Sequence, residues 1–203
     1  MTMFCFGAFA IILLLPALCE GAHCANGKLE KDEIDDYVLN PVNKYRQTLA
    51  SGKQKNGYSG KNMPKPKDMT TLAWNCDLEK AAIDTLSGRC EFKDDLSDKN
   101  GRATVFFQSY GFEGPVNTDI IKTVFANGLD GIDQFILEGV SSNKVIYKSD
   151  TVDGLRLYVN VIRPKATEIG CALTKCKDEG DPFAIYCIMN AKKLNGGDIV
   201  YEA

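Results

Sequence analysis

Histidine is almost absent from this 203-residue sequence, which has only His23, close to the amino terminus. Catalytic sites of the Ser-His-Asp and Cys-His types need an imidazole that takes the proton from the nucleophile. The chain after residue 23 offers no imidazole for either mechanism, so we expect a protein that is not an enzyme. Asn-x-Ser/Thr sequences are also absent, and N-linked glycosylation is therefore not expected.

Long apolar runs are equally scarce, and the only one covers residues 4–15, ahead of the first charged residue, Glu20. This run is shorter than the roughly 20 apolar residues that span a bilayer. Together with the small residues before Cys19, it predicts a signal peptide over residues 1–19 that is removed on export. Since the first three residues carry no Lys or Arg, a retained amino-terminal anchor is the alternative. The expected product is a secreted, extracellular domain of residues 20–203 with no membrane span.

Cysteine is abundant by comparison, with eight in the chain. Loss of Cys5 and Cys19 with the signal peptide leaves an even number, as an oxidising compartment favours. Zinc binding is the competing interpretation, because Cys171 and Cys176 lie close together. Their C-x4-C spacing has no second Cys or His pair beside it, so disulfides are the better prediction. The cysteines that remain are Cys24, Cys76, Cys90, Cys171, Cys176 and Cys187.

The formal net charge of −3 hides an uneven distribution, because residues 40–70 hold seven basic residues and one acidic residue. A polyanion could bind there. The segment is also rich in Gly and Pro, and we see neither a recognition helix nor the interleaved aromatics typical of nucleic-acid binding. A solvated loop is therefore the favoured interpretation, no nucleic acid is expected, and the candidate polyanion patch consists of Lys53, Lys55, Lys61, Lys65 and Lys67.

Hydrophobic periodicity predicts a mixture of helices and strands, hence an α+β fold. In the helix over residues 30–50, Asp32 is the expected cap and Pro41 the expected interruption. The alternation of apolar residues over 155–162 predicts a strand whose inner face is sheet core rather than a lipid pocket. The other predicted helices are 76–87, 118–126 and 132–137, and the other predicted strands are 103–109, 169–173 and 183–189. In the helix over 76–87, Glu79 is expected to point outward.

Several segments match one family in order along the chain. They are Asn43-Lys44-Tyr45-Arg46, the run Met69-x-x-Leu72-x-Trp74-x-Cys76-x-Leu78-Glu79, Ile169-Gly170-Cys171-Ala172, and the closing residues 194–201. The chain resembles the CAP superfamily (SCP/TAPS), and within it the nematode activation-associated secreted proteins and venom-allergen-like proteins. The resemblance is to a single-domain member.

The resemblance implies a three-layer α-β-α sandwich with a small antiparallel sheet between the helices. It also implies the disulfides Cys24–Cys76, Cys90–Cys176 and Cys171–Cys187. By analogy with relatives, we expect a secreted, non-enzymatic effector that binds host proteins or cell surfaces, as a monomer or weak dimer. The alternative is a carrier of small lipids such as sterols or fatty acids, with Ile120, Ile121, Val124 and Phe125 as the wall of its groove.

Many relatives carry two His and two Glu around a central cleft that can hold a divalent metal. The matching positions here are Asp94, Ala103 and Leu157, with the second Glu aligned near Gln134 and Phe135. Leu and Ala cannot ligate a metal, so no metal and no cofactor are expected. The neighbouring acids Asp94, Asp95 and Asp98 do not have EF-hand spacing, and a solvated turn is the favoured interpretation of that segment.

Overall fold

The structure is a computed structural model that describes residues 22–86, 98, 100–109, 118–176 and 183–203. The predicted signal peptide, Cys90 and Asp94 lie outside the described residues. Within the described ranges, no helix is both long and apolar enough to cross a bilayer.

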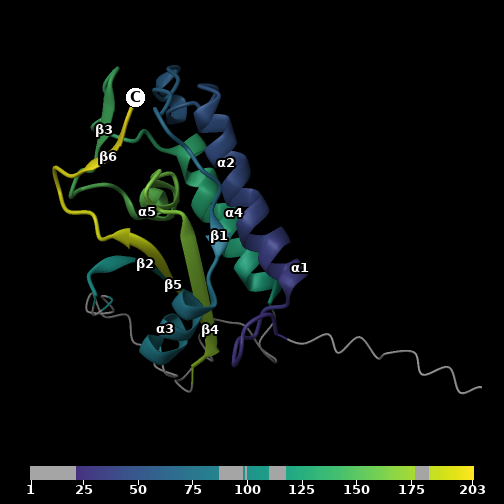
Figure 1. Cartoon of the computed structure of the whole chain (residues 1–203). Helices are drawn as coiled ribbons and strands as arrows, with labels where there is room; N and C mark the ends of the chain where they lie inside the picture. The colour runs from purple at the N-terminus through teal and green to yellow at the C-terminus, as the bar shows by residue number, and fades with distance from the viewer. Residues whose placement is uncertain (1–21, 87–97, 99, 110–117, 177–182) are drawn as a thin grey trace, which may run out of the picture.

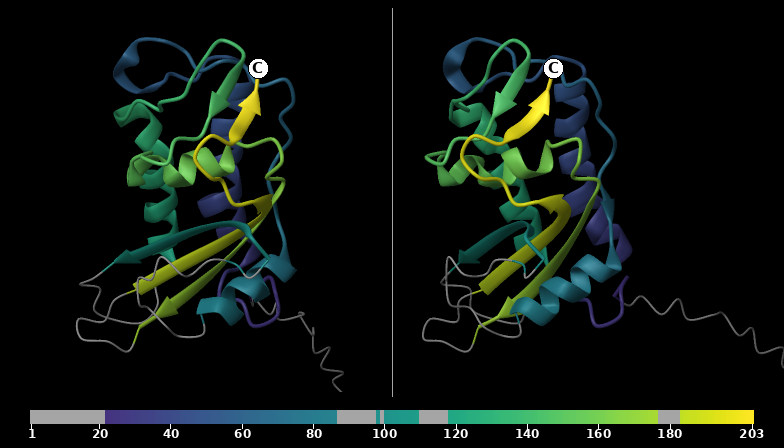
Figure 2. Two further views of the ribbon diagram at one scale, coloured as in Figure 1. Left: turned by 90° about the vertical axis from the view of Figure 1, so that its left-hand side faces the viewer. Right: turned by 60° about the vertical axis from the view of Figure 1, so that its left-hand side comes forward.

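A four-stranded sheet forms the middle layer, in the order β1-β4-β5-β2 (Figures 1 and 2). Its strands are β1 (Ala73–Trp74), β4 (Glu168–Lys175), β5 (Phe183–Lys192) and β2 (Arg102–Ser109). β1 pairs with β4 in parallel, and the other two pairings are antiparallel. The α+β sandwich and its small sheet are thus confirmed, and the sheet has one parallel edge.

Helices cover both faces of this sheet. Helix α3 (Cys76–Leu86) packs Leu78, Ala82 and Leu86 on one face, against Ala184, Tyr186 and Ile188 of β5. The opposite face of β5 belongs to a larger core that includes the remaining helices. Because β5 is covered on both sides, every residue from 183 to 189 is buried.

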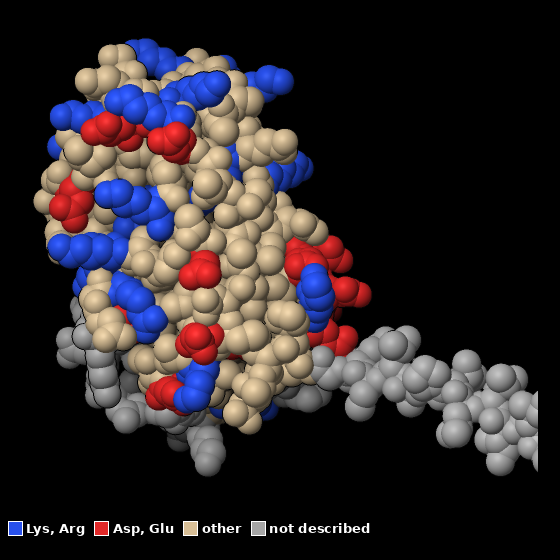
Figure 3. Space-filling view, in the orientation of Figure 1, with Lys and Arg blue, Asp and Glu red and all other residues tan. Residues whose placement is uncertain are grey.

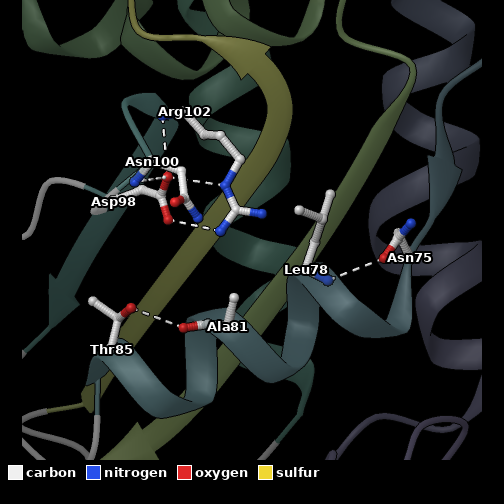
Figure 4. Close-up of polar contacts among 7 residues, drawn as sticks. All are labelled: Asn75, Leu78, Ala81, Thr85, Asp98, Asn100 and Arg102. Carbon is white, nitrogen blue, oxygen red and sulfur yellow. Dashed lines mark hydrogen bonds and ion pairs between the residues drawn. The ribbon is translucent and has the colours of Figure 1, made fainter.

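Asn75 caps α3, and Asp98 fixes the start of β2 (Figure 4). Asn75 Oδ1 accepts from the backbone N–H groups of Asp77 and Leu78, at 2.9 and 3.0 Å, as an N-cap side chain does. Asp98 accepts from the backbone N–H groups of Asn100 and Arg102 and from the Arg102 guanidinium. The solvated turn expected around Asp98 is wrong at this residue, which is buried and ion-paired. These hydrogen bonds to Arg102 also lower the pKa of Asp98.

The first long helix is interrupted as predicted. It consists of α1 (Lys31–Ile34), the π-helical segment η1 (Asp35–Leu39) and α2 (Asn40–Ala50), with Pro41 in the first turn of α2. Proline has no N–H for the helical ladder, and the ladder shifts to a π pattern just before it. The predicted cap is wrong: the N-cap is Glu30, whose backbone N–H donates to Glu33 Oε2 at 2.9 Å.

Helix α4 (Asp119–Gln134) replaces two shorter predicted helices. Its glycines are contact points rather than helix ends. A Cβ at Gly128 would lie 2.7 Å from Leu157 Cδ2, and one at Gly131 would lie 2.0 Å from Gly154 O. Glycine therefore lets α4 approach α5 (Asp153–Val161) more closely than any other residue would.

The predicted strand over 155–162 is wrong, because this segment forms helix α5. Leu157 and Val161 face the main core. Leu155, Tyr158, Val159 and Ile162 join a second core, beside the two-stranded sheet of β3 (Lys144–Ile146) and β6 (Ile199–Glu202). The polar residues Asp153, Arg156 and Asn160 recur at helical spacing on the remaining face, so the alternation of the apolar residues was not a strand signal.

Two disulfides join described cysteines, Cys24 to Cys76 and Cys171 to Cys187, and both are pairs that the resemblance implies. The second links directly opposite residues of β4 and β5. Cys176 is also disulfide-bonded. Because Cys90 lies outside the described residues, its pairing with Cys176 stays a prediction.

Candidate functional site

Two of the positions that the resemblance matches to a metal site of relatives, Ala103 and Leu157, lie in the protein core. Ala103 on β2 and Leu157 on α5 are each 1% exposed and share one buried cluster with Val42. Gly128 provides the space that the Leu157 side chain occupies. An apolar cluster offers no donor atom to a cation, so these residues do not fit a metal.

The one metal-type cluster among the described residues is His23, Cys24 and Cys76. Cys24 and Cys76 are joined in a disulfide, so neither sulfur is available as a thiolate ligand. A single imidazole remains, which is too few ligands for a zinc site.

The open site is a groove of about 550 Å³ between the first long helix and α4. Its lining includes three aspartates and three lysines, and two of the lysines come from the loop after α2. Its lining comprises Asp36, Asn40, Pro41, Lys44, Tyr45 and Thr48 from the first helix, Lys53, Gln54 and Lys55 from the loop, and Ala126, Leu129, Asp130 and Asp133 from α4. The groove therefore carries charged side chains of both signs, on a lining that also includes Pro41, Ala126 and Leu129.

Tyr45 organises the acidic side of the groove. Its hydroxyl donates to Asp130 Oδ1 at 2.7 Å and lies 3.3 Å from Asp133 Oδ2. The ring packs edge-on against Tyr158, with centroids 6.0 Å apart. Burial, followed by the hydrogen bond to Asp130, raises the pKa of Tyr45. The phenol therefore stays protonated and acts as a fixed donor rather than as a base.

The basic side of the groove is not neutralised. Within the described part of the chain, Lys44, Lys53 and Lys55 have no ion-pair partner within 4 Å. The residues that line the groove do not place a nucleophile beside a base that could activate it. The arrangement is suited to binding a polar partner of mixed charge.

The structure separates the lysines of the predicted polyanion patch. Lys53 and Lys55 line the groove, whereas Lys67 is paired with Glu202 at 3.0 Å. Lys61 lies beyond the groove, on a compact hairpin rather than on a solvated loop. Sequence reasoning also overlooked an aromatic residue within this segment, Tyr58, which is 78% exposed.

The residues predicted to line a lipid groove are packed in or against the main core instead. Ile120, Ile121 and Phe125 are at most 7% exposed and belong to the main core, and Val124 packs against that core. Their hydrophobic spacing is that of a buried helix face. From α4, the groove is lined instead by residues 126–133.

The Asn-Lys-Tyr-Arg motif has a structural role that its residues did not reveal. Asn43 exchanges two hydrogen bonds with the backbone of Leu72, at 2.9 and 2.7 Å. The Arg46 side chain is 1% exposed and donates to the carbonyls of Thr70, Val161, Arg163 and Ala166. Burial lowers the pKa of Arg46 to about 10. This side chain fixes the chain before β1 to the end of α5.

Glu79 is buried, not outward-facing as predicted. It is 1% exposed, and its Oε2 accepts from Trp74 Nε1–H at 2.7 Å. Burial raises the pKa of Glu79, and the Trp74 hydrogen bond opposes this shift. The side chain borders a small cavity of about 160 Å³ beside Leu86 and Cys171. Helical periodicity missed it, because a carboxylate is ordinarily assigned to the solvent face.

The described residues combine a sandwich of helices and sheets, two disulfides and a groove with charges of both signs. The model of the cysteine-rich secretory protein family, CAP, matches residues 39–190, and the chain belongs to this family. A search of curated proteins found no match.

Three solved structures with the same fold match most of this chain. "NaASP2 with Zn2+" has a TM-score of 0.69 at 19% identity, covering 88% of this chain and 90% of that chain. "Na-ASP-1" has a TM-score of 0.69 at 22% identity, covering 90% of this chain and 42% of that chain. The venom allergen-like protein 4 of Schistosoma mansoni has a TM-score of 0.53 at 19% identity, covering 86% of this chain and 96% of that one.

Proposed function

We propose that this chain is a secreted, non-enzymatic CAP-domain effector that binds a protein or cell-surface molecule of a host through the α2–α4 groove. The proposal rests on the contrast between two sites. Ala103 and Leu157, two of the positions that the resemblance matches to the metal cleft, are core residues, each 1% exposed. The accessible groove carries charges of both signs, with Lys44, Lys55, Asp130 and Asp133 in its lining.

A groove of this chemistry favours a polar macromolecular partner. Unpaired lysines and carboxylates at a rim attract complementary charges and orient the encounter. The Tyr45 hydroxyl is held by Asp130, so the acidic side is ordered before a partner arrives and less freedom is lost on binding. Secretion, cleavage after Cys19 and the extent of the domain over residues 20–203 are parts of the same proposal.

Carriage of a sterol or fatty acid receives less support. The residues expected to form its wall are buried in the core, and lysines and aspartates line much of the open groove. A small-molecule lipid site is ordinarily lined mainly by apolar and aromatic side chains.

A capture experiment tests the proposal. The oxidised protein is immobilised and exposed to candidate host fluids and cells, and the retained molecules are identified by mass spectrometry. Lys44→Glu reverses one groove charge without breaking an ion pair among described residues. Lys193→Glu makes the same change at an exposed lysine outside the groove. We expect Lys44→Glu to weaken the captured interaction at least about tenfold, with no change for Lys193→Glu.

Equal retention by both variants would place the contact surface elsewhere. Failure of the unaltered protein to retain any host molecule more strongly than an unrelated disulfide-linked domain would reject the effector role. Lipids extracted from the same captured material test the carrier alternative directly.

A further inference from the structure

The segment after α2 forms a fixed hairpin, residues 53–63, which we call the basic hairpin. Met63 N–H donates to Gln54 O at 2.7 Å, and Asn56 N–H donates to Lys61 O at 2.9 Å. Lys55 and Asn62 are paired as an antiparallel bridge. The tip turns at Gly57 and Gly60, both with positive φ, and contains the short helix η2 (Gly57–Ser59).

A buried amide anchors this hairpin to the segment after α4. Asn56 is 7% exposed and exchanges two hydrogen bonds with the Leu137 backbone: its Nδ2 donates to Leu137 O at 3.0 Å, and Leu137 N–H donates to its Oδ1 at 2.7 Å. At Gly57, a Cβ would lie 2.4 Å from Phe135 O. The hairpin tip is therefore held directly against residues 135–136.

This contact places two segments that carry exposed apolar side chains next to each other. Tyr58 is 78% exposed, Phe135 42% and Ile136 36%. Monomeric proteins expose single apolar residues commonly, whereas several exposed on adjoining segments can form a binding surface. Since the hairpin is anchored, the exposure of Tyr58 is a property of the fold.

Unpaired cations surround the apolar tip. The basic hairpin holds Lys53, Lys55 and Lys61 and no acidic residue. Among the residues that the structure describes, none of these lysines has an ion-pair partner within 4 Å, unlike Lys31 and Lys80, each of which pairs with an aspartate one turn on. Lys and Arg also predominate along the upper edge of the molecule in Figure 3, where Figure 1 places the carboxyl end of α2.

We propose that the basic hairpin docks the protein on the surface of an anionic lipid bilayer, with Tyr58, Phe135 and Ile136 at the level of the headgroups. Tyrosine favours this interface, because its ring is apolar and its hydroxyl polar. Flanking lysines gain from acidic headgroups while their alkyl stems lie along the apolar boundary. A soluble polyanion would satisfy the lysines and leave the apolar side chains in water, so the combination favours a membrane surface.

Vesicle sedimentation with the secreted full chain tests this docking. The probes are vesicles of phosphatidylcholine alone and of phosphatidylcholine with phosphatidylserine, at physiological ionic strength. We expect binding only to the anionic vesicles. Lys55→Gln/Lys61→Gln should reduce the partition coefficient more than about tenfold, since each lysine near an anionic surface contributes a several-fold factor. Tyr58→Ser should reduce it by a similar factor.

The matched control is Lys165→Gln/Lys193→Gln, which removes two exposed lysines outside the hairpin and should leave vesicle binding unchanged. Circular dichroism verifies that each variant is folded. Equal loss in the control, or no binding of the unaltered protein to anionic vesicles, overturns the proposal. Loss with the hairpin lysines but not with Tyr58→Ser, accompanied by equally strong binding to heparin, overturns it in favour of a soluble polyanion. Lys44→Glu should leave vesicle binding intact, so this result and that of the groove experiment are separable.

Discussion

Leu157 and Gly128 form a complementary large and small pair whose energetic coupling can be measured. Leu157 is 1% exposed at the position where relatives carry a metal-binding histidine. Truncating a buried leucine to alanine costs about 3 kcal/mol, from lost burial and from the cavity left behind. We therefore expect Leu157→Ala to lower the free energy of unfolding by about 3 kcal/mol.

Gly128→Ala acts on the other side of the same contact. The new Cβ would lie 2.7 Å from Leu157 Cδ2, a clash that requires the leucine to move. Alanine gains about 1 kcal/mol over glycine within a helix, which offsets part of the overpacking cost of up to about 3 kcal/mol. We expect a net loss of about 1 kcal/mol.

The double variant Gly128→Ala/Leu157→Ala should lose much less than the sum of the two. With the leucine truncated, the nearest remaining atom is its Cβ, 3.2 Å from the new methyl group. The methyl group then fills part of the cavity and keeps its helical advantage. We expect a total loss of about 2 kcal/mol, and so a coupling free energy of about 2 kcal/mol.

Urea unfolding of the oxidised proteins gives the required free energies, provided that all variants share one m-value. Asn127→Ala, at an exposed position next to Gly128, is the matched control and should combine additively with Leu157→Ala. Additivity of Gly128→Ala and Leu157→Ala within about 0.5 kcal/mol would refute the packing argument.

Three further outcomes follow from the buried contacts. Gly131→Ala should cost about 3 kcal/mol in urea unfolding, because its Cβ meets the Gly154 carbonyl at 2.0 Å and backbone cannot rotate away; a loss below about 1 kcal/mol would mean that the helices separate easily. Arg46→Lys should lower the melting temperature, with a loss of about 3 kcal/mol, because an ammonium group cannot reach all four carbonyls. Burial raises the pKa of Glu79 in the folded protein, so ionisation of this carboxyl opposes folding. The stability that the protonated Glu79 contributes is fully present below the pKa of the unfolded chain. It is lost as pH rises through the pKa of the folded protein. Glu79→Gln, which keeps an acceptor for Trp74, should therefore gain stability relative to the unaltered protein as pH rises, and parallel stability curves against pH would contradict this.

Part of the fold could be predicted from the sequence. The helix over 76–87 and the strands over 103–109, 169–173 and 183–189 were found because their boundaries or composition are distinctive. Helix α5 was missed because its apolar residues alternate over 155–161, which hid the helical spacing of Asp153, Arg156 and Asn160. Helix α4 was divided because Gly128 looks like a helix end when its contact with Leu157 is unknown.

The candidate site was predictable only in part. Matching motifs assign Ala103 and Leu157 to positions where relatives carry metal ligands, and this assignment stays a prediction. The groove depends on the hydrogen bond between Tyr45 and Asp130, which are 85 positions apart in the sequence. A local sequence pattern cannot predict such a contact. Likewise, the lysines after α2 were recognised from composition, whereas the anchoring of Asn56 to Leu137 became visible only in the folded chain.

The disulfide between β4 and β5 has a consequence for how the sheet selects its alignment. A strand with one solvent-exposed face cannot shift its register by a single residue, because the shift would expose its apolar side chains. Residues 183–189 have no solvent-exposed face. Burial of apolar side chains alone would therefore favour a shifted register of β5 almost as much as the native register. The bond between Cys171 and its direct partner Cys187 is compatible with the native register of β4 and β5 and excludes the shifted registers. Oxidation therefore supplies positional information that the hydrophobic pattern lacks, and a reduced chain would have to find its register without it.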